Sequence, residues 1–173
     1  MKVYDLQTAI ANANKITEFY LHNRGVKTLP KEVLSFKKLR KLDLSKNKIE
    51  SLPEELASLK DLEELNLNSN PLFHIPNIIY RLNGLKKLHV SDANINKIEA
   101  SISKLKSLEI LDVSNNSISR LPAGIGKLIM LKKLFVQNNR IQKFPEQLFQ
   151  CKEIIAIDAC YNRLNELPET SGS

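Results

Sequence analysis

The chain has few of the residues that many protein classes depend on. Its 173 residues include no Trp, only 5 Gly and only 2 Cys, and aromatic residues make up 6%. Such composition excludes a collagen-like chain and a disulfide scaffold, and it leaves few glycines for phosphate-cradling loops. The apolar runs are too short to span a bilayer. Asp5 and Gln7 interrupt the N-terminal stretch where a secretory signal needs unbroken apolar sequence. We therefore expect a cytoplasmic protein with no membrane partner.

Sequence motifs of catalysis are missing as well. There is no glycine-rich nucleotide loop, no G-x-S-x-G and no H-E-x-x-H. Cys151 and Cys160 form no C-x-x-C pair, so neither thiol is expected to be reactive. No inserted loops interrupt the sequence pattern to wall off a pocket. We expect no enzyme activity, no metal and no cofactor.

What the sequence has instead is a regular repeat of 23 residues. The best copy, from Leu108, reads L-x-x-L-x-V-x-x-N-x-I-x-x-L-P-x-x-I-x-x-L-x-x. We number its columns from one at Leu108. Seven copies follow one another without insertion, starting at Ile16, Leu39, Leu62, Leu85, Leu108, Leu131 and Ile154.

The spacing of the apolar columns predicts the structure of each repeat. Columns four and six are apolar in every copy, which predicts a short strand that buries them and exposes columns three, five and seven. The later L-P-x-x-I-x-x-L spacing suits a short helix or 3₁₀ turn, with proline in column fifteen except at Glu99. Such strands are too short to stand alone. Stacked repeats should therefore form one parallel sheet with the return segments behind it.

Column nine is asparagine in most repeats. An inward-facing Asn has two donors and an acceptor for backbone groups that a tight turn leaves unpaired, which predicts a structural ladder. We expect an interruption at Ala93 unless Asp92, Asn94 or water substitutes, and Arg24 also replaces the Asn in the first repeat. The ladder residues are Asn47, Asn70, Asn116, Asn139 and Asn162.

These columns resemble those of the leucine-rich repeat family, and within it the intracellular class with LPxxIxxLxxLxxLxLxxNxI, found in bacterial proteins and Ras-associated scaffold proteins. The resemblance implies an α/β fold: a right-handed solenoid with a parallel sheet on its concave face and short helical or 3₁₀ return segments on its convex face. It also implies that the concave face binds other proteins. The repeats would cover residues 16–168.

The two ends of the chain differ from the repeats. Residues 1–15 lack the strand pattern, but Leu6, Ile10 and Ala13 share one helical face and Asp5 can cap the start, so we predict an N-terminal capping helix. Residues 169–173 are predicted to be a disordered tail. The seventh repeat lacks its return segment, which predicts an uncapped apolar end.

The charges follow the repeat. The formal net charge is +7, which raises the question of nucleic acid. Neighbouring strands lie roughly 4.8 Å apart, so the alternating signs of columns two and three should form a lateral ladder without a continuous basic groove. We therefore expect no nucleic-acid partner. His22 and His89 lie roughly 14 Å apart, too far to share a metal. The alternating residues are Arg40 and Lys41, Glu63 and Glu64, Lys86 and Lys87, Glu109, and Lys132 and Lys133.

Apolar side chains gather in the exposed columns near the C-terminal end. Apolar groups on an outward face mark a partner surface, and an aromatic anchor between Asp112 and Asp158 suits a partner with an apolar and a basic residue. We predict a non-enzymatic module that binds a protein or peptide through Ile110, Asp112, Phe135, Gln137, Ile155, Asp158 and Tyr161.

The same apolar residues allow an alternative role in structure or assembly. They can pack at the uncapped C-terminal end, which then forms a weak homodimer or docks a following domain.

Overall fold

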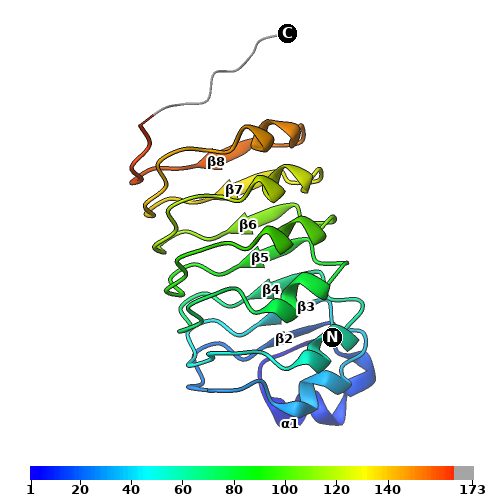
Figure 1. Ribbon diagram of the computed structural model, residues 1–173. Helices are drawn as coiled ribbons and strands as arrows, with labels where there is room; N and C mark the ends of the chain where they lie inside the picture. The colour runs from blue at the N-terminus through cyan, green and yellow to red at the C-terminus, as the bar shows by residue number, and fades with distance from the viewer. Residues whose placement is uncertain (166–173) are drawn as a thin grey trace.

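In the computed structural model, which describes residues 1–165, eight short parallel strands stack in chain order into one sheet (Figure 1). Neighbouring strands pair column to column, so that Leu42 lies opposite Leu65, and Leu65 opposite Leu88. The strands are β1 (Lys2–Val3), β2 (Glu18–Tyr20), β3 (Lys41–Asp43), β4 (Glu64–Asn66), β5 (Lys87–His89), β6 (Ile110–Asp112), β7 (Lys133–Phe135) and β8 (Ala156–Asp158).

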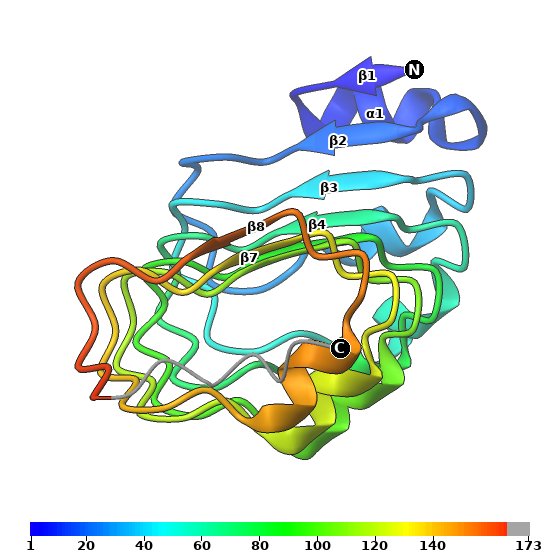
Figure 2. The same cartoon turned by 90° about the horizontal axis from the view of Figure 1, so that it is seen from above.

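A 3₁₀ helix follows each strand from β2 to β7 on the other side of the solenoid (Figure 2). Proline precedes all of them except η5, where Glu99 adopts φ −74° and ψ 153°, close to the −71° and 150° of Pro122. The conformation of the return segment therefore does not depend on the proline ring. These helices are η2 (Lys31–Ser35), η3 (Glu54–Ser58), η4 (Asn77–Arg81), η5 (Ala100–Lys104), η6 (Ala123–Lys127) and η7 (Glu146–Gln150). The predicted solenoid fold is confirmed.

The core runs as stacked apolar columns between the sheet and the 3₁₀ helices. Columns four and six are buried in every repeat from β2 to β7, and full burial of each such side chain contributes about 1.5–3 kcal/mol. The column ends at β8, where Ile157 is 40% exposed. The solenoid therefore shows core surface at this end of the described structure.

The sheet begins earlier than the sequence predicts. Residues 1–15 were expected to contain no strand, but β1 pairs with β2 and places Val3 in register with the core residue Phe19. The Met1 carbonyl accepts hydrogen bonds from the amides of Thr17, at 2.9 Å, and Glu18, at 3.2 Å. β1 therefore pairs the backbone groups along the edge of β2, which would otherwise be exposed and unpaired.

The N-terminal helix is shorter than expected and uses a different face. Helix α1 (Leu6–Ala11) starts at Asp5, whose Oδ1 accepts the Thr8 amide at 2.8 Å, as predicted. A 3₁₀ turn, η1 (Ala13–Lys15), follows it. Ala9 is buried while Ile10 is 42% exposed, so the prediction for Ile10 is wrong. The helix ends before Ala13 and therefore does not extend one continuous face to it.

Each ladder asparagine joins two turns. Asn139 Nδ2 donates to the carbonyls of Val113 and Val136 at 2.9 and 3.0 Å, and its Oδ1 accepts the Ile118 amide at 2.9 Å. Asn116 also donates to Val113, at 3.0 Å. One carbonyl thus receives two side-chain amides from consecutive repeats, which ties the turns together.

The interruption at Ala93 is closed by the next repeat. Asn116 Oδ1 accepts the amides of both Ala93, at 3.1 Å, and Ile95, at 2.9 Å. Within the described residues, the side chains of Asp92 and Asn94 do not make the hydrogen bonds that the asparagine side chain makes in the other repeats. Asn94 takes a left-handed φ of 57° instead, and Gly25 does the same, at 67°, after Arg24. Both repeats without the asparagine therefore share an altered turn.

The predicted repeat boundary at residue 168 and the predicted tail of residues 169–173 lie outside the described residues.

Candidate binding surface on the concave face of the sheet

The outward columns of the sheet form three neighbouring zones. We call columns two and three the charge ladder, and the central side chains of His89, Ser91, Asp112, Ser114 and Asn115 the polar network. We call Ile110, Phe135, Ile155 and Tyr161 the C-terminal patch. All three arise because strand residues alternate between the core and the concave face.

The charge ladder pairs as the sequence predicts. Burial tends to raise the pKa of Glu64, but the ammonium groups of Lys41 and Lys87 outweigh it and hold that pKa below its usual value. Exposed pairs of this kind contribute little stability each, and they place a carboxylate between successive cations along the strands from β3 to β7. The ion pairs are Arg40–Glu63 at 2.8 Å, Lys86–Glu63 at 3.3 Å, Lys41–Glu64 at 2.6 Å, Lys87–Glu64 at 3.4 Å and Lys132–Glu109 at 2.7 Å.

The ladder stops at β7. Column three is Ile110 in β6 and Ala156 in β8, and the sheet register sets these two residues on either side of Lys133. Lys133 is exposed and has no acidic partner within residues 1–165. An unpaired ammonium therefore lies among apolar neighbours at the edge of the C-terminal patch.

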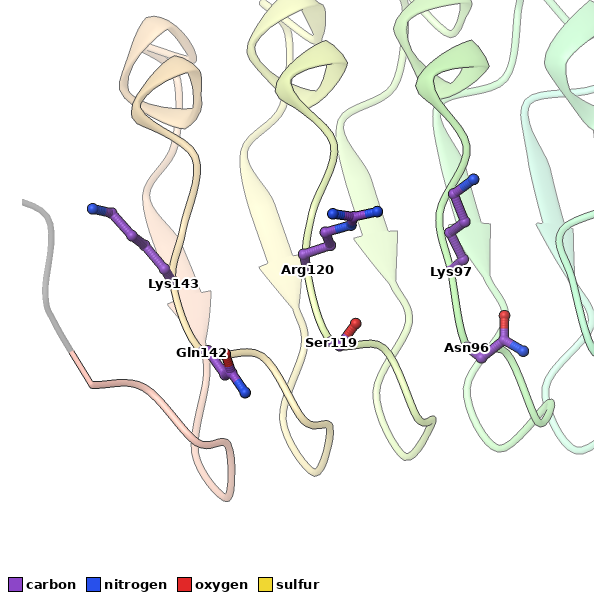
Figure 3. Close-up of a pocket in the computed structure, with 6 residues that line it drawn as sticks. All are labelled: Asn96, Lys97, Ser119, Arg120, Gln142 and Lys143. Atoms are coloured by element: carbon purple, nitrogen blue, oxygen red, sulfur yellow. The ribbon is translucent and has the colours of Figure 1, made fainter.

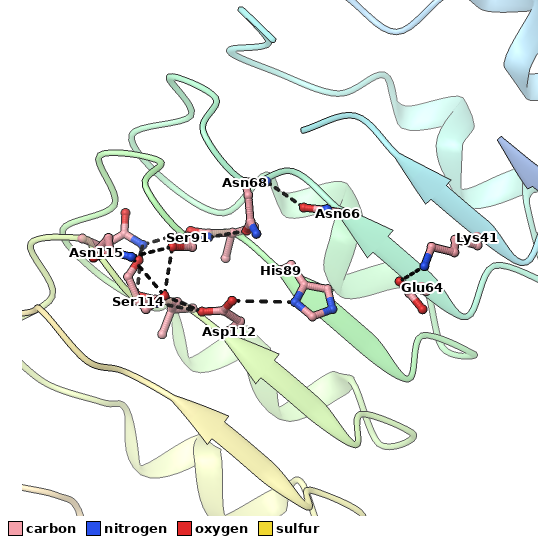
Figure 4. A network of polar contacts seen from close by, with 12 residues as sticks. Lys41, Glu64, Asn66, Asn68, His89, Ser91, Asp112, Ser114 and Asn115 are labelled. Carbon is pink, nitrogen blue, oxygen red and sulfur yellow. Dashed lines mark hydrogen bonds and ion pairs between the residues drawn. The ribbon is translucent and has the colours of Figure 1, made fainter. Parts of the chain in front are cut away.

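The polar network engages a carboxylate that the sequence assigned to partner binding (Figure 4). Asp112 Oδ1 accepts the Ser114 hydroxyl at 2.7 Å and its amide at 3.1 Å, while Oδ2 lies 3.7 Å from His89 Nδ1. Burial opposes ionisation of Asp112, but the nearby His89 ring and the hydrogen bonds from Ser114 outweigh it and lower the pKa. The Ser91 hydroxyl donates to Ser114 Oγ at 2.9 Å, and Asn115 Nδ2 donates to Ser91 Oγ at 3.0 Å. Asp112 is thus held within the protein.

A shallow groove of about 570 Å³ runs along the polar side of the concave face. Asn66 Oδ1 and Asn68 Oδ1 accept the amides of Asn68 and Ser91, at 3.0 and 2.7 Å, which leaves their Nδ2 donors without partners in the described structure (Figure 4). Such donors suit the carbonyl groups of an extended chain. The groove is lined by Ser45, Lys46, Asn66, Asn68, Ser69, Ser91, Asp92, Asn115 and Asn138.

This groove is absent from the predicted site. The sequence signal was the run of small polar residues in columns five and seven, such as Asn66 and Asn68. Whether an amide donor stays free depends on its neighbours in the next repeat, which the repeat pattern alone does not reveal.

The residues predicted from the sequence lie in or near strands β6 to β8, and the register places only some of them next to one another. In the register, Phe135 lies between Asp112 and Asp158, and Ile110 lies beside Lys133. Phe135 and Ile110 are half-buried, whereas Ile155 is 75% exposed just before β8. Gln137 Oε1 is buried without a hydrogen bond, so Gln137 faces the protein more than the solvent.

Tyr161 is exposed and conformationally unusual. It is 85% exposed and has φ 55°, in a column where all seven residues are left-handed. The other six are Asn, Asp, Ser or Lys, and a left-handed angle costs an ordinary residue roughly 1–2 kcal/mol. Neither burial nor backbone geometry accounts for an aromatic residue here, and strained, exposed side chains cluster at functional sites.

The concave face also holds a serine, a histidine and an aspartate in contact. Ser45 Oγ lies 2.8 Å from His22 Nδ1 and donates to Asp43 Oδ1 at 2.6 Å. A serine nucleophile must give its proton to the histidine. Here the hydroxyl is buried and donates to the carboxylate, so the three residues close a turn and do not form a nucleophile.

The thiols and histidines offer no reactive centre either. Cys151 is buried, with Sγ 3.3 Å from the Ile125 carbonyl. The neighbouring Asp158 raises the pKa of the exposed Cys160 thiol, which disfavours the thiolate. Within residues 1–165, no three His, Cys, Asp or Glu side chains converge as metal ligands. The same part of the chain has no helix long and apolar enough to cross a membrane.

A second, basic surface lies on the segments that lead from each turn toward the following 3₁₀ helix (Figure 3). It encloses a shallow cavity of about 600 Å³. Lys97 is paired with Glu99 at 3.1 Å, and Arg120 and Lys143 extend in opposite directions (Figure 3). The cations therefore do not converge on one ligand position. The cavity is lined by Asn96, Lys97, Ser119, Arg120, Gln142 and Lys143.

The stacked strands, 3₁₀ returns and asparagine ladder define a leucine-rich repeat protein. The model of the leucine rich repeat family matches residues 14–72 and 83–141, and the chain belongs to this family. The repeat is a common protein-interaction module. No curated protein sequence matches the chain significantly.

Several solved structures are similar in fold. A leucine-rich repeat protein of Leptospira interrogans is 29% identical, with a TM-score of 0.88 over 94% of this chain and 41% of that one. TLR13, in a complex with ssRNA13, is 26% identical, with 0.79 over 96% and 24%. The Arabidopsis thaliana receptor kinase GASSHO1/SCHENGEN3, in complex with CASPARIAN STRIP INTEGRITY FACTOR 2, is 25% identical, with 0.75 over 93% and 20%. This chain spans less than half the length of each.

Proposed function

We propose that the chain is a non-enzymatic interaction module that binds a protein or peptide on the concave face. The observation that carries the proposal is the C-terminal patch, where Ile155 and Tyr161 are largely exposed before and after β8, the strand that neighbours Phe135. Aromatic anchors are enriched at the centres of protein interfaces, and polar and charged groups surround them at the rim. The patch continues along the sheet into the groove with the free amide donors of Asn66 and Asn68, so one extended partner can contact both.

The comparisons support a binding role without naming the partner. One similar structure is a complex with CASPARIAN STRIP INTEGRITY FACTOR 2, and another is a complex with ssRNA13. We favour a protein because carboxylates alternate with the cations of the charge ladder, which interrupts a continuous basic path for a phosphate backbone. RNA is tested as an alternative below.

We also propose a cytoplasmic location and the predicted division into an N-terminal cap and repeats. Both cysteines are free in the structure, which suits a reducing compartment. Asp5 caps α1, and β1 closes the edge of β2, as a capping segment should.

The direct test compares two phenylalanine variants. Phe135→Ala removes the concave anchor, while Phe149→Ala removes an aromatic that is 39% exposed in η7, on the opposite side of the solenoid. Circular dichroism should show both variants folded. In a pull-down from a lysate of the source cells, we expect partners of the parent chain to be lost with Phe135→Ala and kept with Phe149→Ala. Equal retention by both variants would place the binding site elsewhere.

A second candidate function is assembly through the C-terminal end. The core-column residue Ile157 is 40% exposed there, and a stacked copy or a following domain would bury it. Light scattering over a range of concentrations tests this role, with Ile155→Asp as the variant. A concentration-dependent dimer that Ile155→Asp abolishes supports assembly, whereas a monomer at all concentrations removes the homodimer.

A further inference from the structure

The cation at the end of the charge ladder differs from the others in its column. Lys41 and Lys87 occupy the same column as Lys133 in β3 and β5, and both contact the Glu64 carboxylate, at 2.6 and 3.4 Å. Lys133 has Ile110 on one side and Ala156 on the other. The repeat that should supply its acidic neighbour supplies an apolar residue instead.

The adjacent column shows the same change. Lys132 pairs with Glu109 on its β6 side, at 2.7 Å, and on its β8 side the equivalent position is Ile155. The alternation of acid and base along the sheet therefore ends in a basic strand followed by apolar side chains. An acidic group of a partner above β7 would supply the carboxylate that Lys133 lacks, and an apolar group near it would cover Phe135.

The carboxylates near Phe135 are less available than this ammonium. Asp112 is engaged by Ser114 and His89, and Asp158 Oδ1 accepts the Cys160 amide at 3.2 Å. The whole chain carries a net charge of +7, which attracts acidic ligands over a distance. The structure thus favours an acidic partner residue, where the sequence had suggested a basic one.

We infer that the partner is an extended peptide segment in which an acidic side chain stands two positions from a large apolar one, because alternate side chains of an extended chain face the same way. The acid pairs with Lys133, and the apolar side chain packs on Phe135, two residues further along β7. This inference rests on the proposed function, and it adds the chemistry of the partner.

The free amide donors set a length for this segment. Asn66 is in β4 and Phe135 in β7, three strand spacings away, or roughly 14 Å at about 4.8 Å each. An extended chain rises about 3.3 Å per residue, so roughly four residues separate the acidic–apolar pair from the part held by Asn66 and Asn68. The segment should therefore contain a spacer of roughly four residues. The side chains of the spacer can vary as long as its backbone stays extended.

A random peptide library displayed on phage is the probe for this inference. It is selected on the full chain and on two charge-reversal variants, Lys133→Glu and Lys87→Glu. Both variants change the net charge equally and in the same column, but Lys87 lies two strands from Lys133 and already contacts Glu64. Circular dichroism verifies that each variant folds.

The parent chain and Lys87→Glu should both enrich peptides with Asp or Glu two positions from Phe, Leu or Ile. Lys133→Glu should lose that preference for acid and favour Lys or Arg. A synthetic peptide of the selected sequence should bind Lys133→Glu at least about tenfold more weakly than the parent, and Lys87→Glu within about twofold. Added salt should weaken binding to the parent, because the contact is ionic and exposed.

Several outcomes would overturn the inference. One is enrichment of the same acidic peptides by Lys133→Glu, and others are enrichment without any acidic residue or no enrichment at all. A single-stranded RNA oligonucleotide that binds the parent but not Lys133→Glu would assign the ammonium to phosphate instead. The Phe135→Ala pull-down separates the two proposals: partner loss there with no acidic preference in the library refutes only the peptide chemistry.

Discussion

Asn116 and Asn139 make similar hydrogen bonds in the ladder, but their replacement should lower the free energy of unfolding by different amounts. Replacing Asn139 with Ala removes donors to Val113 and Val136, but Asn116 still donates to Val113 and Asn162 still donates to Val136. The Ile118 amide alone then loses its partner.

Asn116 is different because the next ladder position toward the N-terminus is Ala93. Its replacement with Ala leaves three backbone groups without a partner: the amides of Ala93 and Ile95 and the carbonyl of Val90. Each buried group that loses its partner costs roughly 1–3 kcal/mol. Two additional groups therefore make Asn116→Ala at least about 2 kcal/mol more destabilising than Asn139→Ala.

Urea unfolding followed by circular dichroism measures this difference, with the two single variants and the parent side by side. Burial alone predicts the opposite order, because Asn139 is buried and Asn116 is only half-buried. Equal losses for the two variants, or a larger loss for Asn139→Ala, would refute the counting of unpaired groups.

Three further changes test other parts of the structure. Tyr161→Asn should raise the free energy of unfolding by up to about 1 kcal/mol in urea, because Asn tolerates a left-handed φ better, and no gain would show that Tyr161 is not strained. The lowered pKa of Glu64 means that its ion pairs stabilise the fold above the ordinary pKa of 4.5 and are lost as the pH falls further. Glu64→Gln should therefore flatten the decline in urea midpoint between neutral pH and about pH 3, and an unchanged slope would argue against these pairs. Gly126→Ala would drive a methyl group into the Gln147 carbonyl and should cost roughly 1–3 kcal/mol, whereas Gly84→Ala, 3.4 Å from the nearest atom, should cost little. A thermal melt that ranks these two equally would contradict the packing of η6 on η7.

Most of the fold could be predicted from the sequence because each repeat states the same local pattern. Columns four and six, the return segments and the paired charges follow from spacing and strand geometry alone. β1 could not be predicted, because two residues carry no periodicity and its stability comes from the free edge of β2. The buried face of α1 was misassigned because six residues are too few to fix a helical face.

The binding surface was less predictable than the fold. The sequence pointed to Phe135, Ile155 and Tyr161, since apolar residues in outward columns stand out against a polar background. It did not show that Asp112 is engaged within the protein or that Lys133 lacks a partner. Those properties depend on side chains from adjacent repeats, which meet only when the repeats stack.

The most direct measurement is photo-cross-linking from position 135, with benzoylphenylalanine in place of Phe135 and, as the control, in place of Phe149. We expect position 135 to form a discrete adduct with a protein in a lysate of the source cells. That adduct should be absent when the same chain also carries the Lys133→Glu substitution. Position 149 should form none. Adducts from position 149 alone, or equal adducts from both positions, would contradict binding on the concave face.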